Sequence, residues 1–158
     1  MGEHRLAVRV VAARRMAPLA ATGDGVIYVA TGRRLSASEA ARTVVHEVIG
    51  HALPSERAKR AGVPLFELGT AFGSDDQEGR ALLVEERAGL SSAGRRHELA
   101  LRHLAVRAME AGAGFVEVVR LLLGRGAAVA DAVRIAARVL RGGGLGREGA
   151  YLPALLRV

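Results

Sequence analysis

Two histidines and a glutamate lie close together in one apolar stretch of the chain, the segment TVVHEVIGH at residues 43–51. Neutral imidazoles are common zinc ligands, and a carboxylate beside them can take a proton from a metal-bound water. A glutamate directly after the first histidine is also the order of the H-E-x-x-H zinc motif. The types and order of His46, Glu47 and His51 therefore predict a hydrolytic metal site.

The spacing of the two histidines, H-E-x-x-x-H, is one residue longer than in that motif. On a regular helix, five residues turn the chain by about 500°, which leaves the two imidazoles about 140° apart. One extra residue in a turn, a π-bulge, brings them back to one face, and Gly50 beside His51 tolerates such a distortion. The alternative is a buried helix with two unrelated histidines, and the spacing alone leaves both interpretations open.

A third metal ligand is needed, because a catalytic zinc usually has three protein ligands and a water. The chain has no cysteine, so the third ligand must be a histidine, a glutamate or an aspartate. Our candidate is Glu78, which belongs to the next substantial helix; the alternative is an acid that only favours the helix N-terminus. The other histidines are not predicted as ligands: His4, His97 and His103.

Two short strands are predicted before this motif. The valine-rich segments 6–11 and 26–29 have the β-branched residues of strands, and the glycines in segment 22–25 predict a turn before the second strand. The residues between the first strand and this turn are ambiguous. A strand that precedes an H-E helix can pair with an extended peptide, and we assign this role to 26–29.

Helix signals follow along the rest of the chain. Ser36 and Glu39 form a capping-box pattern that predicts a helix start, and Pro54 is expected to end that helix after the histidines. Asp75 and Asp76 predict the N-terminus of the helix that contains Glu78. Three further helices are expected, at 95–111, 115–123 and 128–140, followed by a glycine-rich loop and a short apolar end.

These elements predict an α+β fold that is mostly helical. We expect a single domain over residues 1–158, with a small sheet in 1–35, the active-site helices in 36–90 and C-terminal helices in 91–158. Half of the 158 residues are hydrophobic but only 3% are aromatic, so the core must be built from alanine, valine and leucine.

Composition also excludes some classes of function. No run of about 18 apolar residues spans a membrane, and the arginines near the N-terminus do not form a signal peptide, so we expect a cytoplasmic protein. The net charge of +7 suggests nucleic-acid binding. However, Lys59 is the only lysine, the arginines are spread along the chain, and the few aromatic residues form no base-stacking platform. We therefore expect neither a nucleic acid nor a membrane as partner.

Four segments together resemble one family of peptidases. They are the motif at 46–51, DQEGRALLVE at 76–85, RIAARVLRGG at 134–143 and the ending at 151–158. This set, from about Val26 onward, is similar to the tyrosine carboxypeptidase family, which includes microtubule-associated members and bacterial proteins with a Q-E-G-L-A signature. Arg80 stands where that signature has leucine.

The resemblance implies a zincin-like metallopeptidase domain that cleaves a peptide or a protein C-terminus. By this resemblance His46, His51 and Glu78 hold Zn²⁺ and Glu47 is the general base. The chain is much shorter than the usual members and lacks their long N-terminal region, so specificity for tyrosine does not follow.

Further residues are assigned supporting roles. Glu85 lies seven residues after Glu78, on the same helix face, and can orient a ligand histidine, although it could equally be a surface carboxylate. An oxyanion stabiliser is also needed, and Arg138, Arg141 and Tyr151 are the polar candidates in the segments that resemble the family. Two other functions stay open: a zinc-binding regulatory domain that is non-catalytic or depends on a partner, and a basic nucleic-acid-binding module. Self-association into a homo-oligomer is a further open alternative.

Overall fold

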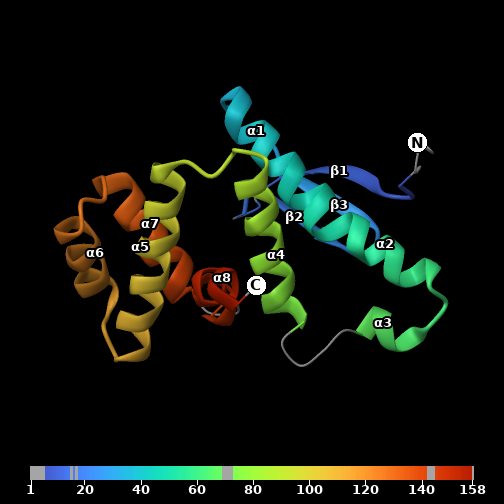
Figure 1. Ribbon diagram of the computed structural model, residues 1–158. Helices are drawn as coiled ribbons and strands as arrows, with labels where there is room; N and C mark the ends of the chain where they lie inside the picture. Colours follow the sequence, from blue (N-terminus) through green and yellow to red (C-terminus); the bar gives the residue numbers. More distant parts are fainter. Residues whose placement is uncertain (1–5, 15, 17, 69–72, 142–144, 158) are drawn as a thin grey trace. The chain divides into compact units, whose positions relative to one another are not determined.

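The computed structural model of the chain describes residues 6–14, 16, 18–68, 73–141 and 145–157 (Figure 1). Its contacts form two compact units, Met1–Ser91 and Ser92–Val158. The first unit contains a small sheet and helices, whereas the described part of the second contains helices alone. The predicted α+β fold, mostly helical with a small N-terminal sheet, is confirmed. The single domain over residues 1–158 stays a prediction.

The sheet has three strands, β1 (Arg9–Ala13), β2 (Ala20–Gly23) and β3 (Val26–Ala30), in the order β1-β3-β2. β1 pairs with β3 in parallel, and β2 pairs with β3 antiparallel. The first strand begins three residues later than the predicted segment 6–11. β2 begins in the stretch that the sequence left ambiguous and continues through residues 22–23, so the turn is limited to the last two residues of the predicted segment 22–25. The sheet therefore has one strand more than the sequence patterns predicted.

β3 lies between the other two strands and is hydrogen-bonded on both sides. A strand in this position has no free edge for an extended peptide, so the peptide-binding role assigned to residues 26–29 is wrong. The edge strands are β1 and β2. The turn between β2 and β3 consists of Asp24 and Gly25, which have φ angles of 49° and 73°. Two residues with positive φ are typical of the tight hairpin turns that match the twist of the strands.

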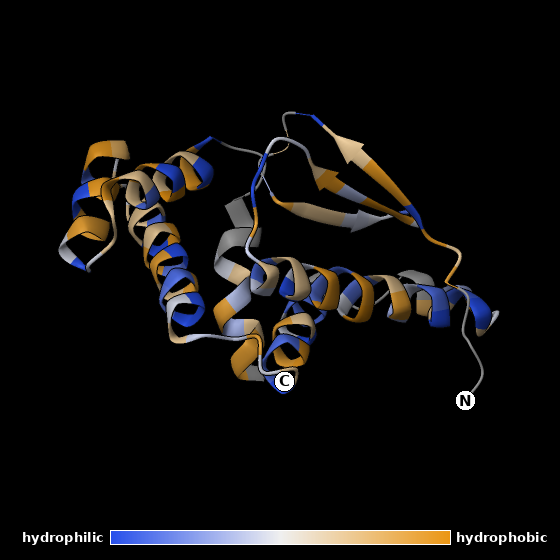
Figure 2. Ribbon diagram, turned by 90° about the horizontal axis from the view of Figure 1, so that it is seen from above, coloured by the Kyte–Doolittle hydropathy of each residue, from blue (hydrophilic) through white to orange (hydrophobic). Residues whose placement is uncertain are grey.

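Three consecutive helical segments run through the histidine motif without a break: α1 (Ala37–Val44), η1 (Val45–Ala52) and α2 (Leu53–Arg60). The predicted capping box is confirmed, because Ser36 and Glu39 hydrogen-bond to each other's backbone N–H. Figure 2 shows hydrophobic colours along the middle of this helix and hydrophilic colours at its α2 end.

The expected helix end at Pro54 is wrong, because α2 continues to Arg60. Proline usually breaks a helix because it lacks an N–H and clashes with the carbonyl one turn earlier. Pro54 is the second residue of α2, which continues from η1, a π-helix at whose end Leu53 N–H donates to Val48 O, five residues back. The wider turn displaces the usual i−4 carbonyl, so the proline ring is tolerated here.

The first unit is completed by α3 (Pro64–Leu68) and α4 (Gly73–Arg87). α4 starts two residues before the predicted acidic cap at Asp75 and Asp76, which lie in its first turn. Residues 69–72, between α3 and α4, lie outside the described residues. α4 packs against η1, and this pair of helices carries the predicted metal ligands and Glu47.

The second unit consists of α5 (Ala93–Glu110), α6 (Phe115–Gly124), α7 (Val129–Leu140) and α8 (Leu145–Arg157). The first three agree with the predicted helices within two residues. Residues 142–144 of the predicted glycine-rich loop lie outside the described residues, and the predicted short apolar end is part of α8, a 13-residue helix that contains Pro153. The helices enclose an apolar core whose buried members are Leu101, Ala105, Val106, Val118, Leu122, Ala132, Ile135, Ala136 and Val139. Among the described residues, no helix has the length and apolar character needed to cross a bilayer.

Candidate metal centre

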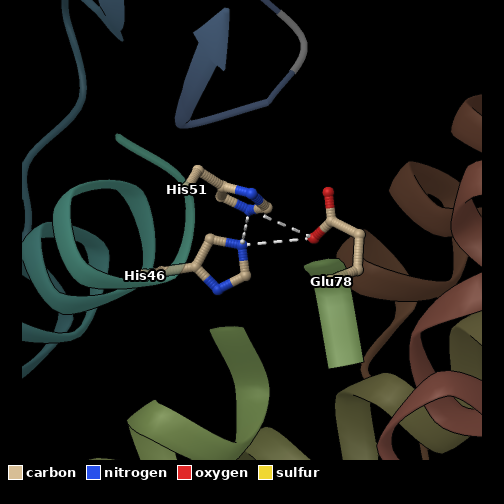
Figure 3. A group of neighbouring side chains, drawn as sticks. All are labelled: His46, His51 and Glu78. Atoms are coloured by element: carbon tan, nitrogen blue, oxygen red, sulfur yellow. Dashed lines mark hydrogen bonds and ion pairs between the residues drawn. The ribbon is translucent and has the colours of Figure 1, made fainter. Parts of the chain in front are cut away.

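The π-helix η1 brings the two histidines of the motif onto one face. His46 Nε2 and His51 Nε2 lie 3.2 Å apart, and their ring centroids are 4.9 Å apart (Figure 3). A π-helix holds more residues per turn than an α-helix, which compensates for the fifth residue in H-E-x-x-x-H. The predicted local widening of the helix is therefore confirmed, and it extends over the eight residues Val45–Ala52.

Glu78 approaches both histidines from α4, the next long helix. Its Oε2 lies 3.3 Å from His46 Nε2 and 3.6 Å from His51 Nε2. Figure 3 shows the two rings on one helix turned toward this carboxylate on the other. Within the described part of the chain, these three residues are the only group of at least three such side chains whose geometry could hold a metal ion.

A close helix contact makes this approach possible. Gly50, in η1, faces Ala81, in α4, and a Cβ added at Gly50 would lie 2.8 Å from the Cα of Ala81 and even closer to its Cβ. Ala81 is fully buried, and Gly79 beside it is buried as well. The small residues around Glu78 in the segment QEGRA therefore allow α4 to lie against the histidine turn.

Glu85 holds the ring of His46 from the opposite side. Its Oε1 lies 2.7 Å from His46 Nδ1, and its side chain is only 1% exposed. Because a carboxylate accepts a hydrogen bond, Nδ1 carries the proton, which leaves Nε2 with a lone pair in the neutral ring. Nε2 faces His51 and Glu78. Glu85 is therefore a buried partner of His46 and not a surface carboxylate, and its role in orienting a metal ligand stays a prediction.

The cluster attracts positive charge. Burial alone lowers the pKa of His46, but the carboxylates of Glu78 and Glu85 outweigh it and raise this pKa to about 9. Burial alone raises the pKa of Glu78, but His46 and His51 outweigh it and lower this pKa to about 2. Two carboxylates beside one imidazole thus favour a cation at their centre, which either a proton or a metal ion can supply.

One buried atom in this cluster lacks a hydrogen bond. Glu78 Oε2 is shielded from solvent, and its contacts with the two histidines are close enough for charge attraction but do not have hydrogen-bond geometry. A buried carboxylate oxygen without a partner costs free energy. A metal ion bound by these three side chains would satisfy this oxygen, so the donor set fits a cation.

Glu47 lies in the same helix, and its side chain accepts a hydrogen bond from a residue of the sheet. Its side chain is buried, and Thr22 Oγ1, in β2, donates to Glu47 Oε2 at 2.7 Å. The sequence patterns missed Thr22 because β2 was not recognised as a strand. Had β2 been recognised, the pairing of Thr22 with Ile27 would have placed these two side chains on the same face of the sheet.

The three residues assigned to substrate binding belong to the second unit. Arg138 and Arg141 lie at the end of α7, and Tyr151 lies in α8. The side chains of Arg138 and Tyr151 are partly buried, whereas Arg141 is exposed. The metal cluster belongs to the first unit. The role of these three residues in substrate binding therefore stays a prediction.

The chain was compared with known families, curated proteins and solved structures. A family model described as "Microtubule-associated tyrosine carboxypeptidase" matches residues 2–158, which is almost the whole chain. Neither a curated protein nor a solved structure gives a significant match. The resemblance seen from about Val26 onward is thereby confirmed and extends over the N-terminal sheet as well.

Proposed function

We infer the function from one premise: the chain belongs to the microtubule-associated tyrosine carboxypeptidase family. We propose that it is a zinc-dependent metallopeptidase with a zincin-like core. In this proposal His46, His51 and Glu78 hold Zn²⁺, Glu85 orients His46, and Glu47 is the general base. The substrate is a peptide or a protein C-terminus.

The distances between the three donor atoms are the observation that supports zinc most directly. Ligands at 2.0–2.1 Å in a tetrahedral arrangement lie about 3.3 Å from one another. The observed separations between the two imidazole Nε2 atoms and the Glu78 Oε2 atom are 3.2, 3.3 and 3.6 Å. Two imidazoles and one carboxylate also form the ligand set of a known class of zinc peptidases, in which water takes the fourth position.

Zinc and Glu47 have separate roles in the proposed reaction. A zinc ion held by His46, His51 and Glu78 would supply a water whose pKa is lowered to about 7 as the source of the nucleophile. Glu47 Oε1, the oxygen that Thr22 does not contact, would take the proton from the attacking water. As the oxygen of that water adds to the peptide carbonyl and the C–N bond breaks, Glu47 would pass the proton to the leaving amine nitrogen.

The sheet supports substrate binding through β2. This strand is an edge of the sheet and carries the threonine that contacts Glu47. An extended peptide that pairs with β2 forms main-chain hydrogen bonds beside the general base. We therefore propose that β2, and not β3, pairs with the peptide substrate.

The test starts from the purified protein loaded with zinc. We expect one zinc per chain, and cleavage of at least some members of a peptide library with varied C-termini, as detected by mass spectrometry. Glu47→Gln should keep the zinc but lower kcat by about 100- to 10,000-fold, because the base is lost. Glu86→Gln, an exposed change on α4, is the control that should leave both zinc content and kcat unchanged.

Two outcomes would overturn the proposal in different ways. If the protein binds no zinc, both the proposed metal site and the proposed peptidase activity are ruled out. A protein that binds zinc at this site but cleaves no library peptide is instead a metal-binding domain without catalysis.

A further inference from the structure

We propose that Thr22 is a positioning residue for the general base: its hydroxyl holds one oxygen of Glu47 so that the other oxygen faces the attacking water. This inference rests on the proposed peptidase function. It is carried by the hydrogen bond from Thr22 Oγ1 to Glu47 Oε2 at 2.7 Å, which joins the sheet to the helix of the metal cluster.

The hydroxyl has a single proton, and that proton goes to the carboxylate. The backbone carbonyl oxygen of Glu47 lies farther from Thr22 Oγ1, at 3.5 Å, than the carboxylate oxygen does. Within the described residues no other side chain donates to the Glu47 carboxylate. A donor to a charged acceptor makes a short and strong hydrogen bond, so this contact dominates the orientation of the carboxylate.

The carboxylate needs such an anchor because its last torsion is soft. The terminal torsion of glutamate has broad, roughly two-fold preferences, so a carboxylate with no partner rotates over a wide range. Glu47 is buried, which excludes most of the water that would otherwise solvate it. With Oε2 held by Thr22, Oε1 is left to accept a proton, and the reactive oxygen is defined.

The hairpin fixes the position of Thr22 itself. Thr22 pairs with Ile27, and two residues later the chain turns at Asp24 and Gly25. A two-residue turn sets the register of both strands, and a slip by one residue would move the threonine to the opposite face of the sheet. The β-branched side chain of threonine adds a restricted χ1 angle. The hydroxyl is therefore placed before any substrate binds.

The experiment compares three threonine substitutions in the zinc-loaded protein, with any library peptide that the wild type cleaves. Thr22→Val keeps the shape of the side chain and removes the hydroxyl. It should lower kcat by about 10- to 100-fold at unchanged KM and unchanged zinc content, as expected for one lost hydrogen bond to a charged group. Thr22→Ser restores the hydroxyl and should recover kcat to within about threefold of the wild type.

Thr31→Val is the matched control, because Thr31 is exposed and its hydroxyl donates only to the backbone oxygen of Ala13. It should leave kcat unchanged. The inference is overturned if Thr22→Val keeps the kcat of the wild type, if Thr22→Ser is as slow as Thr22→Val, or if Thr22→Val loses zinc or its folded circular dichroism spectrum. A wild type that binds zinc and cleaves no peptide overturns the proposed function, and this inference with it.

Discussion

The two units of this chain bury different kinds of side chains. In the first unit, the buried residues include two glutamates, Glu47 and Glu85, around a helix with a widened turn. In the second unit, the core consists of nine apolar residues packed between regular helices. Burying a carboxylate lowers the stability of the folded protein, whereas burying a leucine raises it. The first unit therefore bears the cost of two buried carboxylates, whereas the main buried cluster of the second is apolar, with Arg102 as a buried charged residue beside it.

The largest expected effect is a loss of stability in the second unit. Leu122 is fully buried in its core, so Leu122→Ala should lower the free energy of unfolding by about 3 kcal/mol. It should leave the affinity for zinc unchanged, because the metal cluster belongs to the first unit. Urea denaturation measures the first quantity, and competition with a chromophoric zinc chelator measures the second.

The neighbouring residue provides the control for this substitution. Leu123 is 39% exposed, and Leu123→Ala should cost less than about 1 kcal/mol. If Leu122→Ala lowers the zinc affinity by more than a few-fold, the two interiors are not independent and the comparison fails.

The next effect comes from the close contact between η1 and α4. Gly50→Ala places a methyl group against the backbone and side chain of Ala81, so the helices must move apart. We expect a loss of about 2 kcal/mol in stability, which is typical of overpacking. Unlike Leu122→Ala, it should also weaken zinc binding, because Glu78 belongs to the helix that is displaced.

Gly124→Ala makes the same substitution in a helix of the second unit. A Cβ added at Gly124 meets nothing within 4 Å. This variant should gain about 0.5 kcal/mol, since alanine favours a helix over glycine. Equal effects of the two glycine substitutions in urea denaturation would contradict the close helix contact at Gly50.

The arrangement of the site residues was predictable in part, because their types and order carry information. A shared metal site at this histidine spacing needs a widened turn, Gly50 allows one, and η1 supplies it. Glu85 was placed by counting along a helix, and it contacts His46. In both cases the prediction depends on helical periodicity, which is local in sequence.

The missed features depend on contacts between distant residues. β2 is a four-residue strand of small residues, AATG, and it is defined by its pairing with β3 rather than by its own pattern. Without β2, neither its place at the edge of the sheet nor the contact of Thr22 with Glu47 was accessible. Pro54 was expected to end its helix, yet it lies within α2, because the widened turn before it is set by packing and not by the proline itself.

The next prediction compares the zinc affinity after substitution of a buried glutamate and of an exposed glutamate, and the expected effect is smaller. Glu85→Gln should weaken zinc binding by about 10- to 100-fold, because the side chain that fixes the His46 ring loses its charge. The control is Glu86→Gln, since Glu86 is exposed on the same helix. Chelator competition at constant pH measures both variants. If the two variants bind zinc equally well, the charge of Glu85 does not contribute to zinc binding and its side chain only packs in the interior.

The smallest effect is a pH dependence of stability in the second unit, where Glu98 lies among arginines that include the buried Arg102. Burial alone raises the pKa of Glu98, but Arg102, Arg95 and Arg134 outweigh it and lower this pKa to about 2. Because the folded pKa lies below the ordinary value of 4.5, Glu98 contributes stability above about pH 4.5 and loses it as the pH falls towards 2. The contribution should be about 1 kcal/mol, since the side chain is 26% exposed and the charges are screened.

Urea denaturation between pH 2 and pH 7 measures this contribution. Glu98→Gln should lower stability at pH 7 and flatten the acid part of the curve. Glu110→Gln, in an exposed ion pair with Arg107, should leave the curve close to that of the wild type. If Glu98→Gln and Glu110→Gln behave alike, the arginines around Glu98 add nothing to folding. The stability of the second unit would then rest on its apolar core alone, which would sharpen its contrast with the polar interior of the first.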